Sequence, residues 1–233
     1  MSNELDQFTI DDDLFDEFNE ETHPKKKESS RFCKAKKVKQ IKFLKYKNAE
    51  KLARDINFNT LDRIFCVVDG SFIFGDFIEA FFIENNIKSP NLIIETLSMS
   101  QDNVDSLRTL LEKGYIDSID LIVSDYFYSH ERNNLIKYMY NELDINDSFQ
   151  LSVCRTHRKI CKFATTGGKY IMITGSANLR SSDNMESFCI EDNEEFYNFD
   201  KSITDEIITR YKTINKSIKS KELWHLVAKN TQE

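Results

Sequence analysis

Hydrophobic positions after Lys47 fall alternately into short apolar runs and into segments where they recur at helical spacing. The short runs are typical of β-strands, and four of them come first: Arg63–Asp69, Leu92–Leu97, Ile119–Ser124 and Phe149–Cys154. Between them, apolar residues three and four positions apart predict helices over three stretches: Gly75–Asn85, residues 101–113 and residues 135–143. Ser100 and Gly114 bound the second of these helices, as its N-cap and its closing glycine. This alternation predicts an α/β fold.

The pattern changes beyond the fourth run. Two further strand-like segments, Arg158–Thr165 and Tyr170–Thr174, flank the turn sequence of residues 166–169 and predict a hairpin. Another short strand is expected over Ser187–Ile190, a helix from Asn193 onward, and a last short helix around Trp224. We therefore expect a mixed, largely parallel sheet with helices on both faces. No GxGxxG or P-loop sequence follows a predicted strand, which argues against a nucleotide-cofactor fold.

The composition is that of a soluble protein, with 40% hydrophobic and 30% charged residues among 233. No apolar run approaches the roughly 18–20 residues that cross a bilayer, and the acidic start of the chain is unlike a signal peptide. The five cysteines stand apart without a CxxC pair, which argues against a disulfide framework and against a zinc ribbon. We expect a cytoplasmic protein with no membrane partner, no metal and no other cofactor.

The first 47 residues are divided into an acidic block and a basic block, and the whole chain has a net charge of −7. Residues 4–21 carry acids interleaved with Phe and Leu, and no Lys or Arg. We expect residues 1–47 to form a partly disordered extension and residues 48–233 to form the folded domain. The acidic block is a candidate docking peptide for a protein partner, or a cover for the protein's own basic site.

The basic block, residues 25–47, is the strongest local attraction for a nucleic-acid backbone in this acidic chain. Its candidate phosphate-binding residues are Lys25, Lys26, Lys27, Lys34, Lys36, Lys37 and Lys39. The same run is also typical of a solvated stretch or of a localisation-like signal. The basic block alone therefore assigns no function.

Four histidines occur in the chain, and the surroundings of His157 distinguish it. His130 follows the third predicted strand, where a surface position at the start of a helix is the more usual role. His157 and Lys159 lie two positions apart on a predicted strand, so their side chains project from the same face. Ser176 and Asn178 lie just beyond the adjoining strand. The predicted hairpin brings these four side chains around one space.

This set of side chains suits phosphodiester chemistry. An imidazole can attack phosphorus and form a covalent phosphohistidine, which divides one difficult displacement into two easier ones. Lys159 and the Asn178 amide can bind the non-bridging oxygens, and Glu186, at the start of the next strand, is a candidate carboxylate to orient His157. In the alternative interpretation, His157 and Lys159 are ordinary strand residues and the GSAN sequence is only a turn.

The chain resembles the phospholipase D superfamily, in particular its small single-motif nuclease-like members, through residues in this order: His157, Lys159, Gly175, Ser176, Asn178 and Glu186. The resemblance covers roughly Leu61 to Phe199. It departs from the family pattern in two ways. The family has an Asp five positions after the Lys, where this chain has Ala164, and the hairpin here is a few residues longer.

The resemblance implies a phospholipase D-like fold and a metal-independent phosphodiesterase that acts through a phosphohistidine at His157, on nucleic acid rather than lipid. In the family two motifs face each other across a two-fold axis, so a single-motif chain implies a homodimer with its axis near His157. Two other interpretations stay open. One is an inactive DNA-binding protein of the same fold, silenced by Ala164, and the other is an accessory component of a larger, phage-related assembly.

Overall fold

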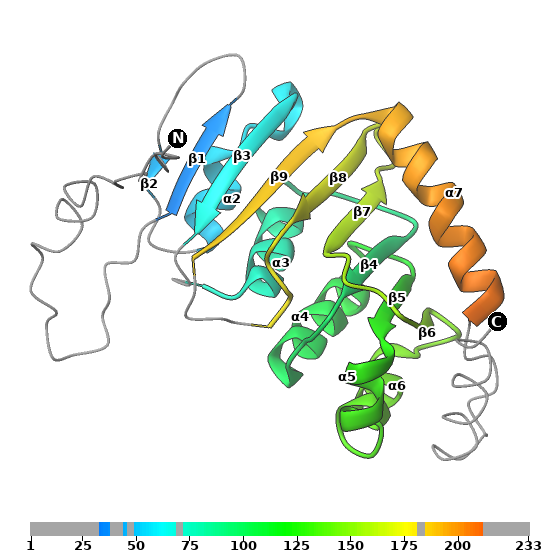
Figure 1. Ribbon diagram of the computed structural model, residues 1–233. Helices are drawn as coiled ribbons and strands as arrows, with labels where there is room; N and C mark the ends of the chain where they lie inside the picture. Colours follow the sequence, from blue (N-terminus) through cyan, green and yellow to red (C-terminus); the bar gives the residue numbers. More distant parts are fainter. Residues whose placement is uncertain (1–32, 38–43, 46–48, 69–71, 181–184, 212–233) are drawn as a thin grey trace, which may run out of the picture. The chain divides into compact units, whose positions relative to one another are not determined.

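The computed structural model describes residues 33–37, 44–45, 49–68, 72–180 and 185–211 (Figure 1). Their strands are β1 (Cys33–Lys37), β2 (Leu44–Lys45), β3 (Arg63–Val68), β4 (Leu92–Thr96), β5 (Ile119–Ser124), β6 (Phe149–Cys154), β7 (Ile160–Ala164), β8 (Tyr170–Gly175) and β9 (Glu186–Asp192). Their α-helices are α2 (Ala49–Asp55), α3 (Phe74–Glu84), α4 (Gln101–Glu112), α5 (Asp125–Glu131), α6 (Leu135–Leu143) and α7 (Glu194–Tyr211). None of these helices is both long and apolar enough to span a membrane.

The strands form a single mixed sheet in the order β2-β1-β3-β9-β8-β7-β4-β5-β6. β4, β5 and β6 run parallel, because helices connect them as crossovers. The pairs β4–β7, β7–β8, β8–β9 and β3–β9 are antiparallel. The mixed α/β class is confirmed, but the expectation of a largely parallel sheet was wrong. The turn between β7 and β8, closed by the Thr165 N–H bond to the Lys169 carbonyl at 2.8 Å, is too short for a crossover and reverses the chain.

Two strands of the sheet come from the basic block. β1 pairs antiparallel with β3, and β2 pairs antiparallel with β1. β1 contains Lys34, Lys36 and Lys37, and the other four candidate phosphate-binding lysines lie outside the described residues. The acidic block and the helix expected around Trp224 also lie outside them. The domain boundary after residue 47 stays a prediction.

Helices cover both faces of the sheet, as predicted. Adjacent side chains of a strand point to opposite faces, and two residues of β7 therefore identify the two layers. Phe163 packs on Phe82 of α3, with ring centroids 4.5 Å apart. Lys162 hydrogen-bonds to Asp200 and Thr204 of α7. α3 and α7 thus lie on opposite faces, and α4 and α6 pack on the α3 side (Figure 1).

The predicted helices agree with α3, α4, α6 and α7, but the sequence patterns did not predict α2 or the helix after β5. α4 begins after Ser100, as expected. The sequence patterns missed α5, which follows β5 directly and is capped by Ser124, whose hydroxyl oxygen accepts from the Phe127 N–H at 3.1 Å. His130 consequently lies in the last turn of α5 and not at a helix start. Its Nδ1 lies 2.7 Å from the carbonyl oxygen of Tyr126.

Candidate active site

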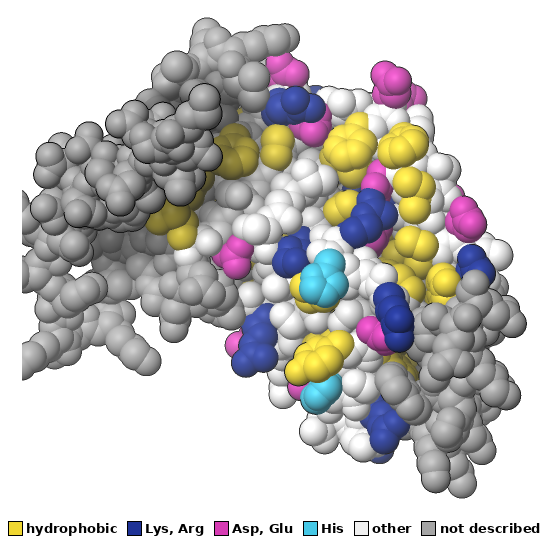
Figure 2. Space-filling model, viewed as in Figure 1, with side chains coloured by type: hydrophobic (Ala, Val, Ile, Leu, Met, Phe, Trp, Pro, Cys, Tyr) yellow, Lys and Arg dark blue, Asp and Glu magenta, His cyan; other side chains and the backbone are white. Residues whose placement is uncertain are grey.

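The predicted site residues lie at one edge of the sheet, where the parallel strands have their carboxyl ends. A row of paired residues runs across the four central strands just inside this edge: Glu95, Ile160, Thr174 and Cys189. The five predicted residues all lie within four positions of this row, on its outer side. Ligands of open α/β sheets commonly bind outside this edge. On the face that Figure 2 shows, histidine side chains are surrounded by Lys and Arg side chains in the lower half of the view, towards α5.

Ser176 and Glu186 form the most closely connected pair of the site. The Ser176 hydroxyl donates to the Glu186 carboxylate and accepts from the Ser187 N–H at 3.1 Å. The Ser176 N–H in turn donates to the Ser187 carbonyl at 2.9 Å. The start of β9 therefore fixes the position of the Ser176 hydroxyl. The expected role of Glu186 in orienting His157 stays a prediction.

Gly175 is required at this position because β8 and β9 approach closely here. A Cβ atom on Gly175 would lie 2.2 Å from the Ser187 carbonyl oxygen and 2.7 Å from the Phe188 Cα. Both atoms belong to the backbone, so neither can move aside without distorting the sheet. The glycine of the GSAN sequence thus permits the strand contact that holds Ser176.

Asn178 is fixed against the connection between β4 and α4. Its carboxamide oxygen accepts from the Leu97 N–H at 3.3 Å. The next two residues continue this contact, because the Leu179 N–H donates to the Thr96 hydroxyl at 3.4 Å and the Arg180 N–H to the Ser98 carbonyl at 3.4 Å. With its oxygen occupied in this way, Asn178 has its amide N–H groups as donors for an anion.

His157 and Lys159 lie just before β7 and not within it. The predicted strand over Arg158–Thr165 begins at Ile160, so the expectation that both side chains project from one face of a strand was wrong. The Lys159 carbonyl still accepts from the Gly175 N–H at 3.3 Å, and this bond places the segment beside β8. The Lys159 amine donates to the His157 carbonyl at 3.2 Å. The His157 side chain is exposed, and among the described residues its ring makes no hydrogen bond.

Ala164 stands where the phospholipase D superfamily has an Asp, and it lies away from His157 and Lys159. Ala164 ends β7, whereas Lys159 immediately precedes its start, and five strand positions span roughly 16 Å. The Ala164 carbonyl accepts from the Ser89 hydroxyl at 2.6 Å. A carboxylate at position 164 would therefore not reach the edge where His157 and Lys159 lie.

A buried cluster of charges lies behind the site, and it was not predicted from the sequence. Lys162 is fully buried and forms ion pairs with Asp200 and, at 3.8 Å, with Glu95. Arg158 pairs with the same two acids, at 3.3 Å from Glu95. The Thr204 hydroxyl donates to Glu95 at 3.0 Å. We call Glu95, Arg158, Lys162 and Asp200 the α7 ion cluster, because Asp200 of α7 pairs with both cations.

The α7 ion cluster anchors the segment that carries the motif. Arg158 stands between His157 and Lys159, so its ion pairs hold this backbone against α7. Burial lowers the pKa of the Lys162 amine, and the adjacent Asp200 carboxylate opposes that shift. Buried charges of this kind are tolerated only when they are paired and hydrogen-bonded. A charged residue inside each of two apolar strand sequences, LIIET and ICKFA, is the signal that indicates such a cluster.

The arrangement at the edge is suited to binding an anion. Lys159 and Asn178 supply donors, Ser176 is held by Glu186, and His157 is open to solvent. In the part of the chain that the structure describes, no three His, Cys, Asp or Glu side chains are placed to hold a metal ion. The groups present can therefore bind a phosphate and present an imidazole to it.

The similarity of this α/β structure to known proteins is low. The structure is similar to NucT from Helicobacter pylori, with a TM-score of 0.40 and 15% identity over 51% of this chain and 79% of that one. It is also similar to Nuc, a phospholipase D family member from Salmonella typhimurium, with a TM-score of 0.41 and 13% identity over 53% and 81% of the two chains. For phosphatidylserine synthase from Haemophilus influenzae, the TM-score is 0.42 and the identity 13% over 71% and 45%. No family model and no curated protein matches the chain. Likenesses of this size assign neither a family nor an activity.

Proposed function

We propose that the chain is a metal-independent phosphodiesterase, a nuclease that acts through a covalent phosphohistidine at His157. One observation supports the proposal most strongly. The His157–Lys159 segment lies beside the Gly175–Asn178 segment at one exposed edge, where the Gly175 N–H donates to the Lys159 carbonyl. An exposed imidazole beside an ammonium and an amide is the chemistry that attack on a phosphodiester requires.

The proposed reaction has two displacements. In the first, an imidazole nitrogen of His157 forms a bond to phosphorus, and the bond from phosphorus to the leaving oxygen breaks. Lys159 and the Asn178 amide stabilise the negative charge on the non-bridging oxygens as it develops. In the second, water attacks phosphorus and loses a proton to the group that protonated the leaving oxygen, the bond to His157 breaks, and the imidazole is released. Ser176 and Glu186 hold the turn from which Asn178 projects.

The leaving oxygen requires a proton, and one motif supplies only one histidine. We propose that His157 of the partner subunit in a symmetric homodimer donates this proton. The two copies of His157 would then lie on either side of one phosphate, near the two-fold axis. The exposed position of His157 at the sheet edge is compatible with this arrangement.

The proposed substrate is a nucleic acid in a cytoplasmic setting. The basic block, including Lys34, Lys36 and Lys37 of β1, would add attraction for the phosphate backbone. The alternative is a DNA-binding or accessory protein of the same fold without turnover. The hydrogen bond from the Lys159 amine to the His157 carbonyl favours this alternative, because it directs the amine to the backbone and not to a substrate phosphate.

Cleavage in the presence of a chelator tests the proposal. Plasmid DNA, single-stranded DNA and single-stranded RNA are incubated with the full chain and excess EDTA. We expect cleavage of at least one of these substrates at the same rate with and without the chelator, because His157 takes the place of a metal-bound nucleophile. Activity that appears only after a divalent metal is added would contradict the proposal. Salt-sensitive binding without cleavage would support the binding alternative.

A further inference from the structure

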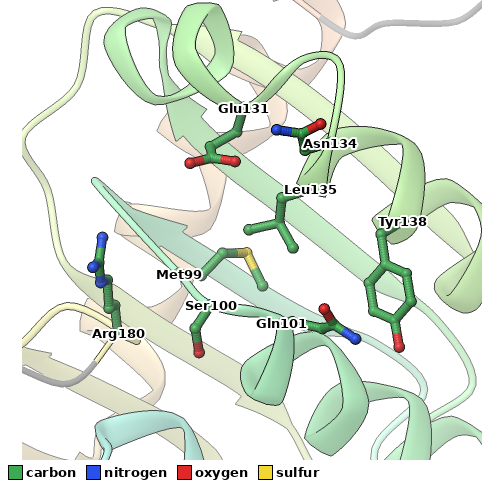
Figure 3. A pocket seen from close by; sticks show the side chains of 8 residues that line it. All are labelled: Met99, Ser100, Gln101, Glu131, Asn134, Leu135, Tyr138 and Arg180. Carbon is green, nitrogen blue, oxygen red and sulfur yellow. The ribbon is translucent and has the colours of Figure 1, made fainter.

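A hollow of about 520 Å³ lies beside the candidate active site, at the same edge of the sheet (Figure 3). The connection from β4 to α4, the corner between α5 and α6, and the loop that carries Arg180 form its walls. The side chains that matter here are Met99, Glu131, Asn134, Leu135, Tyr138 and Arg180. Its volume is within the usual range of small-molecule and cofactor sites.

The floor of the hollow is apolar and its rim is polar. Figure 3 shows the side chains of Met99 and Leu135 between Arg180 and Tyr138, which lie at opposite ends. Met99 is buried, and the Tyr138 hydroxyl donates to Asp105 at 2.6 Å, which fixes its ring. An apolar floor edged by an aromatic ring is suited to a flat heteroaromatic ligand.

Three polar side chains at the rim have unused hydrogen-bonding capacity. Among the described residues, the guanidinium of Arg180, the carboxylate of Glu131 and the carboxamide of Asn134 make no side-chain hydrogen bond or ion pair. The guanidinium offers donors, the carboxylate offers acceptors, and the carboxamide offers both. A ligand with an acceptor edge and a donor edge would pair with this set.

Guanine has this combination of edges. Its N7 and O6 atoms accept hydrogen bonds, and an Arg side chain commonly binds both of them. Its ring N–H and amino groups donate, so the Glu131 carboxylate can accept both. Adenine and cytosine carry a ring nitrogen acceptor next to the amino group, and this atom would face the carboxylate unfavourably. These groups therefore fit guanine better than adenine or cytosine.

The hollow lies close enough to the candidate phosphate site to hold a base of the same strand. Arg180 is two residues beyond Asn178, a separation of at most about 7 Å along the chain. Both residues are held against the β4–α4 connection, where Met99 enters the floor. A nucleotide whose phosphate meets Asn178 thus has the hollow beside it.

We propose that this hollow binds an unpaired guanine base of a single-stranded nucleic acid, next to the phosphate that meets His157. The inference rests on the proposed function for its substrate class. A single strand is required because a base must leave its stack to enter a hollow at the protein surface. Arg180 and Glu131 are the residues that determine the specificity.

Binding measurements test this subsite without turnover. Fluorescence anisotropy compares short oligothymidines that carry one central dG, dA or dC, using the full chain with His157→Ala so that no strand is cut. We expect the strand with dG to bind about tenfold more tightly than the others. Glu131→Gln and Arg180→Ala should each abolish this preference. Glu195→Gln, which removes an exposed carboxylate at the start of α7 near the opposite edge of the sheet, should retain it.

The outcomes separate this inference from the proposed function. Equal binding of all strands, absence of binding, or a dG preference that survives Glu131→Gln would overturn the subsite. In one outcome, the unmodified chain cleaves in the presence of chelator equally well with and without guanine in the strand. That result would support the proposed function and reject the subsite. A dG preference that Glu131→Gln removes, in a chain that never cleaves, would support the subsite and reject the nuclease.

Discussion

Replacing His157 with alanine is expected to lower the rate of phosphodiester cleavage by about 10⁴-fold or more, because the variant lacks the nucleophile of the first displacement. The side chain is exposed and makes no hydrogen bond within the described residues, so its loss removes little packing. The free energy of unfolding should therefore change by less than about 0.5 kcal/mol. Single-turnover kinetics in the presence of EDTA measure the cleavage rate. Urea unfolding of the same preparation measures the free energy of unfolding.

His130→Ala is the matched control for this experiment. His130 is also exposed and also follows a parallel strand, but its ring is held within α5 by the Tyr126 carbonyl and by the Ser129 hydroxyl, 3.1 Å from Nδ1. We expect this variant to cleave at close to the unmodified rate. A His157→Ala protein that is folded and still cleaves as fast as the control would contradict the assignment of the nucleophile.

The second large effect is expected at the α7 ion cluster. Asp200→Ala removes one of the two carboxylates that Lys162 and Arg158 share and leaves Glu95 as the one acid beside the buried Lys162 ammonium. Removing one partner of a buried pair typically lowers the free energy of unfolding by about 3–5 kcal/mol. Urea unfolding followed by circular dichroism measures this loss. Asp200→Ala should also slow cleavage at temperatures where the protein stays folded, because Arg158 loses a partner that fixes the backbone between His157 and Lys159.

Asp205→Ala provides the control on the same helix. Asp205 pairs with Lys201 one turn away on an exposed face of α7, and such pairs contribute about 0.3–0.5 kcal/mol. A double variant, Lys162→Met with Asp200→Leu, removes both buried charges and should recover most of the lost stability. The assignment of the cluster would be wrong if Asp200→Ala cost no more than Asp205→Ala.

The elements of the fold were largely predictable from local patterns. The four apolar runs became β3 to β6. β4, β5 and β6 are buried parallel strands, which are apolar on both faces, whereas β3 pairs antiparallel and alternates between exposed and buried residues. α5 was missed since its seven residues, DYFYSHE, are too few to show a helical stripe beside the preceding strand. The directions of β3 and β9 were not predictable, because their pairing joins segments far apart in sequence and no local signal specifies it.

The meeting of the candidate site residues at one edge was predictable, and their local geometry was less so. Spacing placed His157, Lys159, Ser176 and Asn178 at one edge, because a hairpin brings its two ends together. The start of β7 at Ile160 was not predictable from the residues before it. The segment before this strand is set by Arg158, whose partners come from β4 and α7. Only the folded chain shows such long-range contacts.

The proposed mechanism depends on a bond between phosphorus and the imidazole of His157. Mixing the protein with a single-stranded oligonucleotide in EDTA, quenching within a turnover in alkaline denaturant and mapping the peptides by mass spectrometry measures that bond directly. We predict an oligonucleotide fragment linked through its terminal phosphate to the peptide that contains His157, absent from the His157→Ala protein. Cleavage of the oligonucleotide with no such adduct at any quench time, or with the adduct on another residue, would contradict the proposed mechanism.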